Sequence, residues 1–319
     1  MPSSTPSTTA NEAGSAPALR RSTALFILFG AACYSTSGPL ARWGRPTHPL
    51  LIAFGRLALA ALILGAIEHR AIGPALRGLS WKQRGIVLGA GACLGVHFAL
   101  FQLGLDHTSL PAAVSLIALE PLSVVLTAWL LLKIQPSRRE WLGVFFATAG
   151  AVVVAQGAGT GEHQLAGDLL ILGAVVLYGL YLTVARALKD ALPARSYAAM
   201  VYAGAAVTVS IALLFPPITA GLSMPPPHGL VAILAITLVP TLLGHTAVQT
   251  AARTLPPSIV ALVSPGKTVG AIAIGAALMG ATPTATEIAG ALIILVGSAL
   301  AITAPASPLP LSSGEKRGS

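Results

Sequence analysis

The chain has 319 residues, of which 55% are hydrophobic and only 9% are charged, and its formal net charge is +9. Soluble domains carry about 25% charged residues, so this composition excludes an ordinary soluble domain and indicates a membrane protein with several spans. The cations lie in short segments between apolar runs. This pattern is typical of cytoplasmic anchoring loops and argues against nucleic-acid binding.

Apolar runs of membrane-spanning length follow one another along almost the whole chain. A hydrocarbon core about 30 Å thick needs roughly 20 apolar residues of helix. We predict ten spans, at residues 23–41, 49–67, 85–105, 109–132, 140–156, 169–185, 197–215, 230–250, 255–279 and 284–303. The expected fold class is therefore an all-α membrane protein with ten transmembrane helices.

The segments outside these spans are short and hold no soluble domain. Residues 1–22 and 304–319 are rich in Ser, Pro and Ala, so we expect two disordered cytoplasmic tails. The longest connection, residues 68–84, joins the second and third spans. Residues 157–167 are read as a linker between two halves of the protein.

The distribution of Lys and Arg predicts the orientation in the membrane. If the N-terminus lies inside, the outer loops contain only Arg42 and Arg45, and nearly all other cations fall in cytoplasmic segments. This bias follows the positive-inside rule. We therefore expect a multi-pass protein of a bacterial-type plasma (inner) membrane, with both termini in the cytoplasm.

The two halves of the chain repeat one another. Residues of the same type recur at an offset of 144 or 147: Tyr34 with Tyr178, Pro121 with Pro265, Glu140 with Glu287, Gly143 with Gly290, and Gly150 with Gly297. The domains we predict are two five-span repeats, residues 23–156 and 168–303. Because five is odd, the second copy would enter the membrane upside down and form an inverted repeat.

The fourth span carries Glu120 and Pro121 near its centre. A proline removes a backbone donor and clashes with the preceding turn, so the helix is expected to kink or break there. A carboxylate at this depth faces protein or water rather than lipid. We interpret Glu120 as a substrate-ammonium or proton site, with Ser123 on the same helical face. The alternative is a structural carboxyl that is protonated or hydrogen-bonded at the kink.

The ninth span repeats this design with Ser264, Pro265 and Lys267. By the offset of 144, Glu120 corresponds to Ser264 and Lys267 corresponds to Ser123, so one copy carries the acid and the other the base. An inverted two-fold axis would bring the two charges together. We therefore expect an ion pair that a zwitterion could replace, with its ammonium on Glu120 and its carboxylate on Lys267. A purely structural ion pair is the alternative.

A polar ridge runs along the eighth span at intervals of four residues, formed by Thr237, Thr241, His245 and Gln249. A ridge of this kind is not expected to face lipid, so it faces a cavity or another helix. His245 and Gln249 are candidate residues of a substrate or ion path.

Four further residues inside the spans are candidates for the same path. Arg56 has a stem long enough to snorkel towards the membrane surface, and this interpretation is favoured over a functional one. His97 is read mainly as a neutral, hydrogen-bonded histidine, with proton sensing as the alternative. Tyr34 and Tyr178 occupy matching places in the two copies and could grip a substrate or bind a neighbouring carbonyl.

These features resemble the drug/metabolite transporter superfamily, specifically its EamA-type exporters with ten helices. The residues that carry the resemblance are Glu120-Pro121, Pro136-Ser137, Gly143 and Gly150 in the first copy, and Pro265, Gly280, Pro283-Thr284, Gly290 and Gly297 in the second. Ile134 and Ala281 replace the glutamate of the family's turn motif, which leaves the subfamily open. The resemblance implies export of amino acids, related metabolites or amphipathic drugs.

The sequence contains none of the enzyme or metal motifs that would indicate catalysis: no HExxH, no GxSxG, no P-loop and no cluster of Cys and His. We therefore expect no enzyme, metal or cofactor, but a secondary transporter that exports an amino acid or a similar small amphipathic metabolite by alternating access. The alternatives are a drug or toxic-compound efflux carrier of the same fold and an intramembrane enzyme acting on a lipid-linked substrate. The expected partners are a small-molecule metabolite and membrane lipid, and not nucleic acid. Proton coupling, a homodimer, the direction of transport and the substrate are left open.

Overall fold

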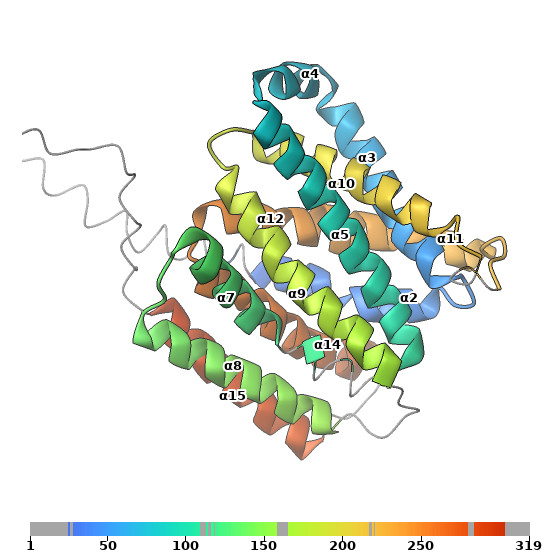
Figure 1. The fold of residues 1–319 in the computed structure, drawn as a ribbon. Coiled ribbons are helices and arrows are strands. Elements are labelled where there is room, and N and C mark those ends of the chain that lie inside the picture. The colour runs from blue at the N-terminus through green and yellow to red at the C-terminus, as the bar shows by residue number, and fades with distance from the viewer. Residues whose placement is uncertain are drawn as a thin grey trace, which may run out of the picture.

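A computed structural model describes residues 28–108, 119–157, 165–216, 221–279 and 284–303, together with a few isolated residues (Figure 1). Within these ranges the regular secondary structure is entirely helical, as the sequence predicts. The predicted tails 1–22 and 304–319 lie outside the described residues, as does most of the linker 157–167.

The helices follow the order of the predicted spans. The first half contains a helical stretch at residues 28–35, then α2 (Ser37–Trp43), α3 (Pro49–Ile67), α4 (His69–Gly78), α5 (Trp81–His107), α7 (Glu120–Leu132) and α8 (Arg138–Gly157). The second half contains α9 (Leu165–Ala187), α10 (Ala194–Ala212), α11 (Pro227–Ile236), the π-helix η2 (Thr237–His245), α12 (Thr246–Thr254), α13 (Pro257–Ala261), α14 (Val263–Met279) and α15 (Ala285–Ile302).

Among the described residues, four helical stretches are both long and apolar enough to cross a membrane. They are Pro49–Ile67, Trp81–His107, Leu165–Ala187 and the continuous stretch Pro227–Thr254. The other predicted spans are shorter, broken or more polar helices. The number of ten spans therefore stays a prediction.

The connection at residues 68–84 contains a helix that the sequence analysis did not predict. This helix, α4, has no buried residue and lies at the top of the bundle in Figure 1. Gly73 and Pro74 within it obscured the helical pattern, since both residues disfavour helix interiors. Its basic residues, Arg70 and Arg77, and its apolar side chains give it the character of a helix lying on a membrane surface.

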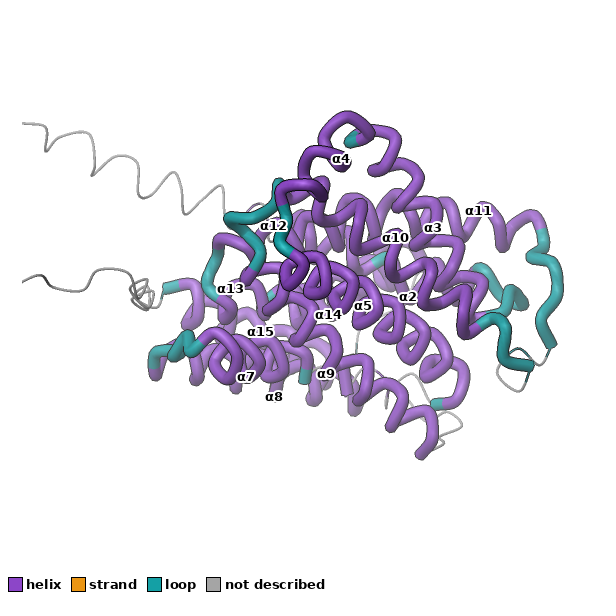
Figure 2. Tube along the Cα trace, turned by 45° about the horizontal axis from the view of Figure 1, so that its top comes forward, coloured by secondary structure: helices purple, strands orange, loops and turns teal. Residues whose placement is uncertain are grey.

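The helices pack as one bundle in which α5 lies between α9 and α10 (Figures 1 and 2). At one edge of the bundle, α8 packs along most of the length of α15. A Cβ atom added to Gly150 would lie 2.7 Å from the Gly290 carbonyl oxygen, and one added to Gly143 would lie 2.8 Å from that of Gly297. The two backbones are therefore in direct contact and run antiparallel, through glycines that match between the two halves.

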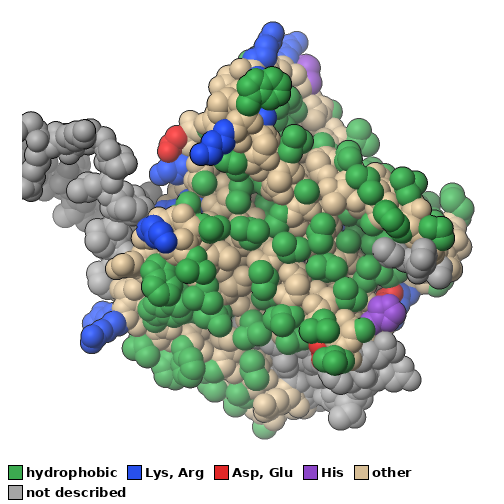
Figure 3. All heavy atoms as spheres, viewed as in Figure 1, with side chains coloured by type: hydrophobic (Ala, Val, Ile, Leu, Met, Phe, Trp, Pro, Cys, Tyr) green, Lys and Arg blue, Asp and Glu red, His purple; other side chains and the backbone are tan. Residues whose placement is uncertain are grey.

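The surface has the polarity of a membrane protein. Large apolar side chains are exposed on the outer faces of several helices, including Leu62, Leu88, Phe145 and Leu292. In Figure 3 hydrophobic side chains dominate the middle of the visible face, whereas Lys and Arg gather at its upper and left margins. An apolar band bordered by cations at one end is what a bilayer requires.

Candidate functional site

Two helices begin in the interior of the protein, at matching places in the two halves. Helix α7 begins at Glu120 after a turn at Leu119, and Pro121 is its second residue. Helix α14 begins after a turn at Leu262 and carries Pro265 in its first turn. The turn at Leu262 confirms a break in the ninth span, whereas most of the fourth span before Leu119 lies outside the described residues; each turn precedes its proline. A proline in the first turn costs no intrahelical hydrogen bond, so it fits the start of a helix.

The two helix starts bring Glu120 and Lys267 together. Glu120 Oε2 accepts a hydrogen bond from Lys267 Nζ at 2.6 Å and another from Ser264 Oγ at 2.5 Å. The Glu120 side chain is 4% exposed and that of Lys267 is 19% exposed. This confirms the ion pair that the repeat predicts. The carboxylate also lies at the N-terminus of α7, where the helix dipole favours a negative charge.

The ammonium group of Lys267 also lies beside two tyrosines that correspond to one another in the repeat. Its Nζ atom is 5.6 Å from the ring centroid of Tyr34 and 5.9 Å from that of Tyr178. A cation at this distance from an aromatic face is attracted by the ring quadrupole. The aromatic rings thus extend the polar site without adding a charge.

His245 lies at the centre of a larger group of rings. Five aromatic side chains have their ring centroids 5.2 to 6.4 Å from that of His245: Tyr34, Phe98, Tyr178, Tyr181 and Tyr202. The Tyr202 hydroxyl lies 3.3 Å from His245 Nδ1. We call these six residues the aromatic cage. Four of the chain's five tyrosines belong to it.

The polar ridge that contains His245 runs through the π-helix η2 and ends at Gln249 in α12. Thr237, Thr241, His245 and Gln249 are all at most 1% exposed, so the prediction that this ridge turns away from lipid is confirmed. Pro240 lies inside the π-helix and lacks the N–H that a regular α-helix would use at that position. The Thr241 hydroxyl donates instead to the carbonyl five residues earlier, at 2.8 Å. Such local widening of a helix is frequent at functional sites.

Arg56 is buried, and the interpretation that it snorkels to the surface is wrong. Its side chain is 1% exposed, and its Nε donates to Thr241 Oγ1 at 2.9 Å. The guanidinium carbon lies 4.1 Å from the centroid of the Phe98 ring. The physical reason is that the face of α3 which carries Arg56 packs inward against the π-helix and α10, so that its long stem has no path to the surface.

Two other predicted site residues, His97 and Ser123, lie outside the cage. His97 is buried beside Tyr178, and its Nδ1 lies 2.8 Å from the Ala174 carbonyl, as expected for a neutral, hydrogen-bonded histidine. Ser123 faces α9, where its hydroxyl donates to the Val176 carbonyl at 3.4 Å. It contacts a neighbouring helix rather than the ion pair.

Phe98, Tyr181 and Tyr202 belong to the cage but are not among the site residues predicted from the sequence. A signal was present, because the tyrosines lie within apolar spans. In membrane proteins tyrosine usually gathers at the two interfaces, so a group of them inside the spans indicates an internal polar site.

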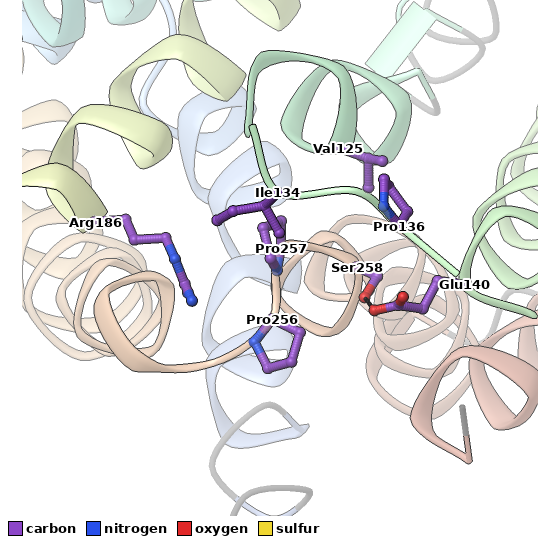
Figure 4. Close-up of a pocket in the computed structure, with 8 residues that line it drawn as sticks. All are labelled: Val125, Ile134, Pro136, Glu140, Arg186, Pro256, Pro257 and Ser258. Carbon is purple, nitrogen blue, oxygen red and sulfur yellow. Dashed lines mark hydrogen bonds between the residues drawn. The ribbon is translucent and has the colours of Figure 1, made fainter. Parts of the chain in front are cut away.

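The Lys/Arg-rich end of the bundle contains a crevice between α7, α8 and the segment that joins α12 to α13 (Figure 4). Ser258 faces Glu140 across it and donates a hydrogen bond to that carboxylate. Glu140 also accepts the Ser137 backbone N–H at 2.7 Å, which caps the start of α8. A second hollow, lined by Val124, Thr183 and Val260, lies between α7, α9 and α13.

Two arginines join the neighbouring helix ends beside this crevice. Arg186 of α9 donates to the carbonyls of Ala252 and Leu255, at the end of α12. Arg253 of α12 donates in return to carbonyls after the end of α9, including that of Lys189 at 2.8 Å. We call this reciprocal arrangement the arginine clasp. Each cation caps the carbonyl end of the other helix, where the helix dipole favours positive charge.

A multi-helix membrane protein with two broken helices and a buried ion pair between them has the architecture of a membrane carrier. Comparison with known families agrees. The model of the EamA-like transporter family matches the chain twice, over residues 21–156 and 165–303. The chain belongs to this family, within the drug/metabolite transporter superfamily. It is a multi-pass membrane transporter and not an enzyme.

Individual relatives are more distant. The chain is 23% identical over 286 residues to the uncharacterized transporter YwfM of Bacillus subtilis (strain 168), an alignment that covers 88% of this chain and 94% of the relative. It is 28% identical over 193 residues to the uncharacterized transporter YyaM of the same organism, covering 59% and 62%. One crystal structure matches the fold with a TM-score of 0.73 at 20% identity, over 88% of this chain and 96% of that chain.

Proposed function

We propose that this protein exports an amino acid or a similar small amphipathic metabolite across the plasma membrane by alternating access. In this proposal ten transmembrane helices form two inverted five-helix repeats, with both termini in the cytoplasm. The observation that carries the proposal is the Glu120–Lys267 ion pair, which lies where two broken helices from different repeats meet.

The contacts between the halves support an inverted two-fold axis. By the offset of 144, Ser35 is equivalent to Gly179, and Ser123 is equivalent to Lys267. The Ser35 hydroxyl donates to the Lys267 carbonyl at 3.0 Å. The equivalent pair is also in contact, because an added Cβ on Gly179 would lie 2.6 Å from the Ser123 carbonyl carbon. A contact that recurs in this way is what a two-fold relation between the repeats produces.

The ion pair supplies a physical basis for zwitterion binding. Each charge alone at mid-membrane depth would cost about 3 kcal/mol on insertion scales, so the empty carrier holds Glu120 and Lys267 against one another. A zwitterion can replace this one pair with two, its ammonium on Glu120 and its carboxylate on Lys267. The cage beside Lys267 would accept an apolar side chain of the substrate. Glu120 and Lys267 then both stay compensated while the substrate is bound.

Alternating access requires one end of the bundle to open. The arginine clasp joins the ends of α9 and α12, and its Arg186 also lines the hollow that contains Val124 and Val260. Opening at this end would break hydrogen bonds from Arg186 and Arg253 to backbone carbonyls. The clasp is therefore the part of the protein that we assign to closure on the cytoplasmic side.

A second candidate function is efflux of drugs or toxic compounds by the same fold. The aromatic cage favours it, because aromatic rings bind apolar and cationic molecules of varied shape. This candidate does not use Lys267 as a ligand for the substrate. The two functions therefore differ in whether a carboxylate on the substrate is required.

Counterflow into liposomes that contain the purified protein tests the proposal. A panel of amino acids, related metabolites and amphipathic cations would be measured with and without a pH gradient. We expect saturable counterflow of at least one zwitterion, lost in Glu120→Gln and in Lys267→Gln and retained in the control Asp106→Asn, which removes an exposed carboxylate. If zwitterions are never carried, and an uncharged or cationic compound is carried even by Lys267→Gln, the proposal is wrong and drug efflux replaces it.

A further inference from the structure

Arg56 is a buried cation without a compensating charge. It is 1% exposed, and its single hydrogen bond within the described residues joins Nε to Thr241 Oγ1. Neither of its terminal nitrogens has a hydrogen-bond partner there. The described part of the chain gives it no ion pair either. Burial of an unpaired charge is costly, so a side chain of this kind indicates a group that a ligand completes.

The charges around the cage do not cancel. Lys267 lies 5.6 Å from the Tyr34 ring and Arg56 lies 4.1 Å from the Phe98 ring, and both rings belong to the cage around His245, so Glu120, Lys267 and Arg56 share one region. Glu120 and Lys267 neutralise one another as an ion pair at 2.6 Å. Arg56 then leaves the region with a net charge of +1 while the histidines are neutral. A ligand that carries one net negative charge would restore neutrality.

The region around His245 also contains polar atoms that lack partners. Phe98 links Arg56 to His245, since its ring lies 4.1 Å from the guanidinium carbon and 5.5 Å from the His245 ring centroid. Within the described residues, no partner is found for His245 Nε2, for either polar atom of the Gln249 side chain, or for the Tyr181 hydroxyl. All three residues are at most 1% exposed. The Phe98 ring thus separates an unpaired cation from a group of unpaired neutral atoms around His245.

The chemistry of this group selects a carboxylate. The two terminal nitrogens of a guanidinium form a planar fork that matches the two oxygens of a carboxylate. One cation among neutral donors balances a single negative charge, whereas a phosphate monoester, with nearly two, would call for further cations. Arg56 has none beside it among the described residues, because Lys267 is already engaged by Glu120.

We propose that Arg56 binds a carboxylate of the substrate that is additional to the groups meeting Glu120 and Lys267. The preferred substrate class is then an organic acid with a net charge of −1, and an acidic amino acid is the case that uses all three charges. This inference rests on the proposed function, in which the same region binds a zwitterion. It adds a preference for acidic over neutral amino acids, which the ion pair alone does not supply.

Matched pairs of acids and amides test the inference. Counterflow by the full-length protein in liposomes would be compared for aspartate with asparagine, glutamate with glutamine, and 2-aminoadipate with its 6-amide. We expect wild type to favour the acid by about ten-fold or more in at least one pair, because a buried charge left without its partner weakens binding strongly. Arg56→Gln should lose this preference and still carry the amide. Arg77→Gln, an exposed arginine on α4, is the control and should change nothing.

The thermal stability of the empty protein gives a second, independent readout. If Arg56 is kept for a ligand, Arg56→Met should unfold at the same temperature as wild type or higher, and glutamate should no longer stabilise it. A purely structural arginine would instead lower the melting temperature when replaced. Equal rates for acid and amide in all three pairs, or a large destabilisation by Arg56→Met, would overturn the inference.

The outcomes also separate this inference from the proposed function. Zwitterions carried without any preference for acids would leave the function standing and remove the role of Arg56. Acids that stabilise wild type but not Arg56→Met, with no zwitterion ever transported, would support the Arg56 site and contradict amino-acid export.

Discussion

The Glu120–Lys267 ion pair and the arginine clasp both hold charged side chains largely away from solvent, but their partners are of different kinds. Arg186 and Arg253 donate to backbone carbonyls, which are fixed by the helices that carry them. Glu120 and Lys267 instead satisfy one another through their side chains. A backbone carbonyl cannot leave its helix end, whereas a side-chain partner can turn to a competing ligand. This difference supports our proposals that the clasp closes one end of the protein and that the ion pair exchanges its partner for a ligand.

The largest effect is expected from removing one member of the ion pair. Glu120→Gln leaves Lys267 buried without a counter-charge and should lower the free energy of unfolding by about 3 kcal/mol. The double variant Glu120→Gln/Lys267→Gln contains no unpaired charge and should be at least as stable as either single variant. Thermal unfolding of the four proteins in detergent measures this coupling. Additive losses would show that the two residues do not depend on one another.

A smaller effect on stability is expected at the clasp. Arg253→Gln removes charge-assisted hydrogen bonds to the end of α9 and should cost about 2 kcal/mol. Because these bonds join two helix ends, their loss should also open the hollow that Thr183 lines, so that a cysteine introduced at Thr183 reacts faster with a maleimide. Arg70→Gln, on the exposed helix α4, is the matched control. Unchanged labelling in Arg253→Gln would mean that the clasp does not close this end.

The smallest effect is expected from the two prolines. Pro121→Ala and Pro265→Ala should leave membrane insertion intact and slow transport a few-fold, because alanine lets each helix extend across the break at Leu119 or Leu262 and so stiffens a joint that gating would use. Initial rates of counterflow, normalised to protein content, measure this. Wild-type rates in both variants would assign the prolines to packing alone.

The repeat is what made the ion pair predictable. An offset of 144 relates Tyr34 to Tyr178 and places Glu120 and Lys267 on equivalent helices, and two-fold geometry then brings them together. The repeat also accounts for the glycine contacts between α8 and α15, because these glycines recur at an offset of 147. These parts of the site follow from residue type and spacing, because both are recorded in the sequence.

The features that were missed depend on neighbours that the sequence does not show. The direction of Arg56 is set by which face of α3 packs on the π-helix, and hydropathy alone cannot choose that face. The clasp uses backbone carbonyls as partners, and these carry no residue type. Pro240 alone does not predict the π-helix, because an isolated proline in a span equally predicts a kink.

Transport by the charge-neutral double variant tests the central claim most directly. Glu120→Gln/Lys267→Gln would be reconstituted beside wild type, with its thermal stability measured to show that it is folded, and counterflow of the zwitterion carried by wild type would be recorded. We predict that the folded double variant carries none of it, because neither the ammonium nor the carboxylate of the substrate finds its partner. Zwitterion transport at the wild-type rate by the double variant would contradict the assignment of the ion pair as the binding site.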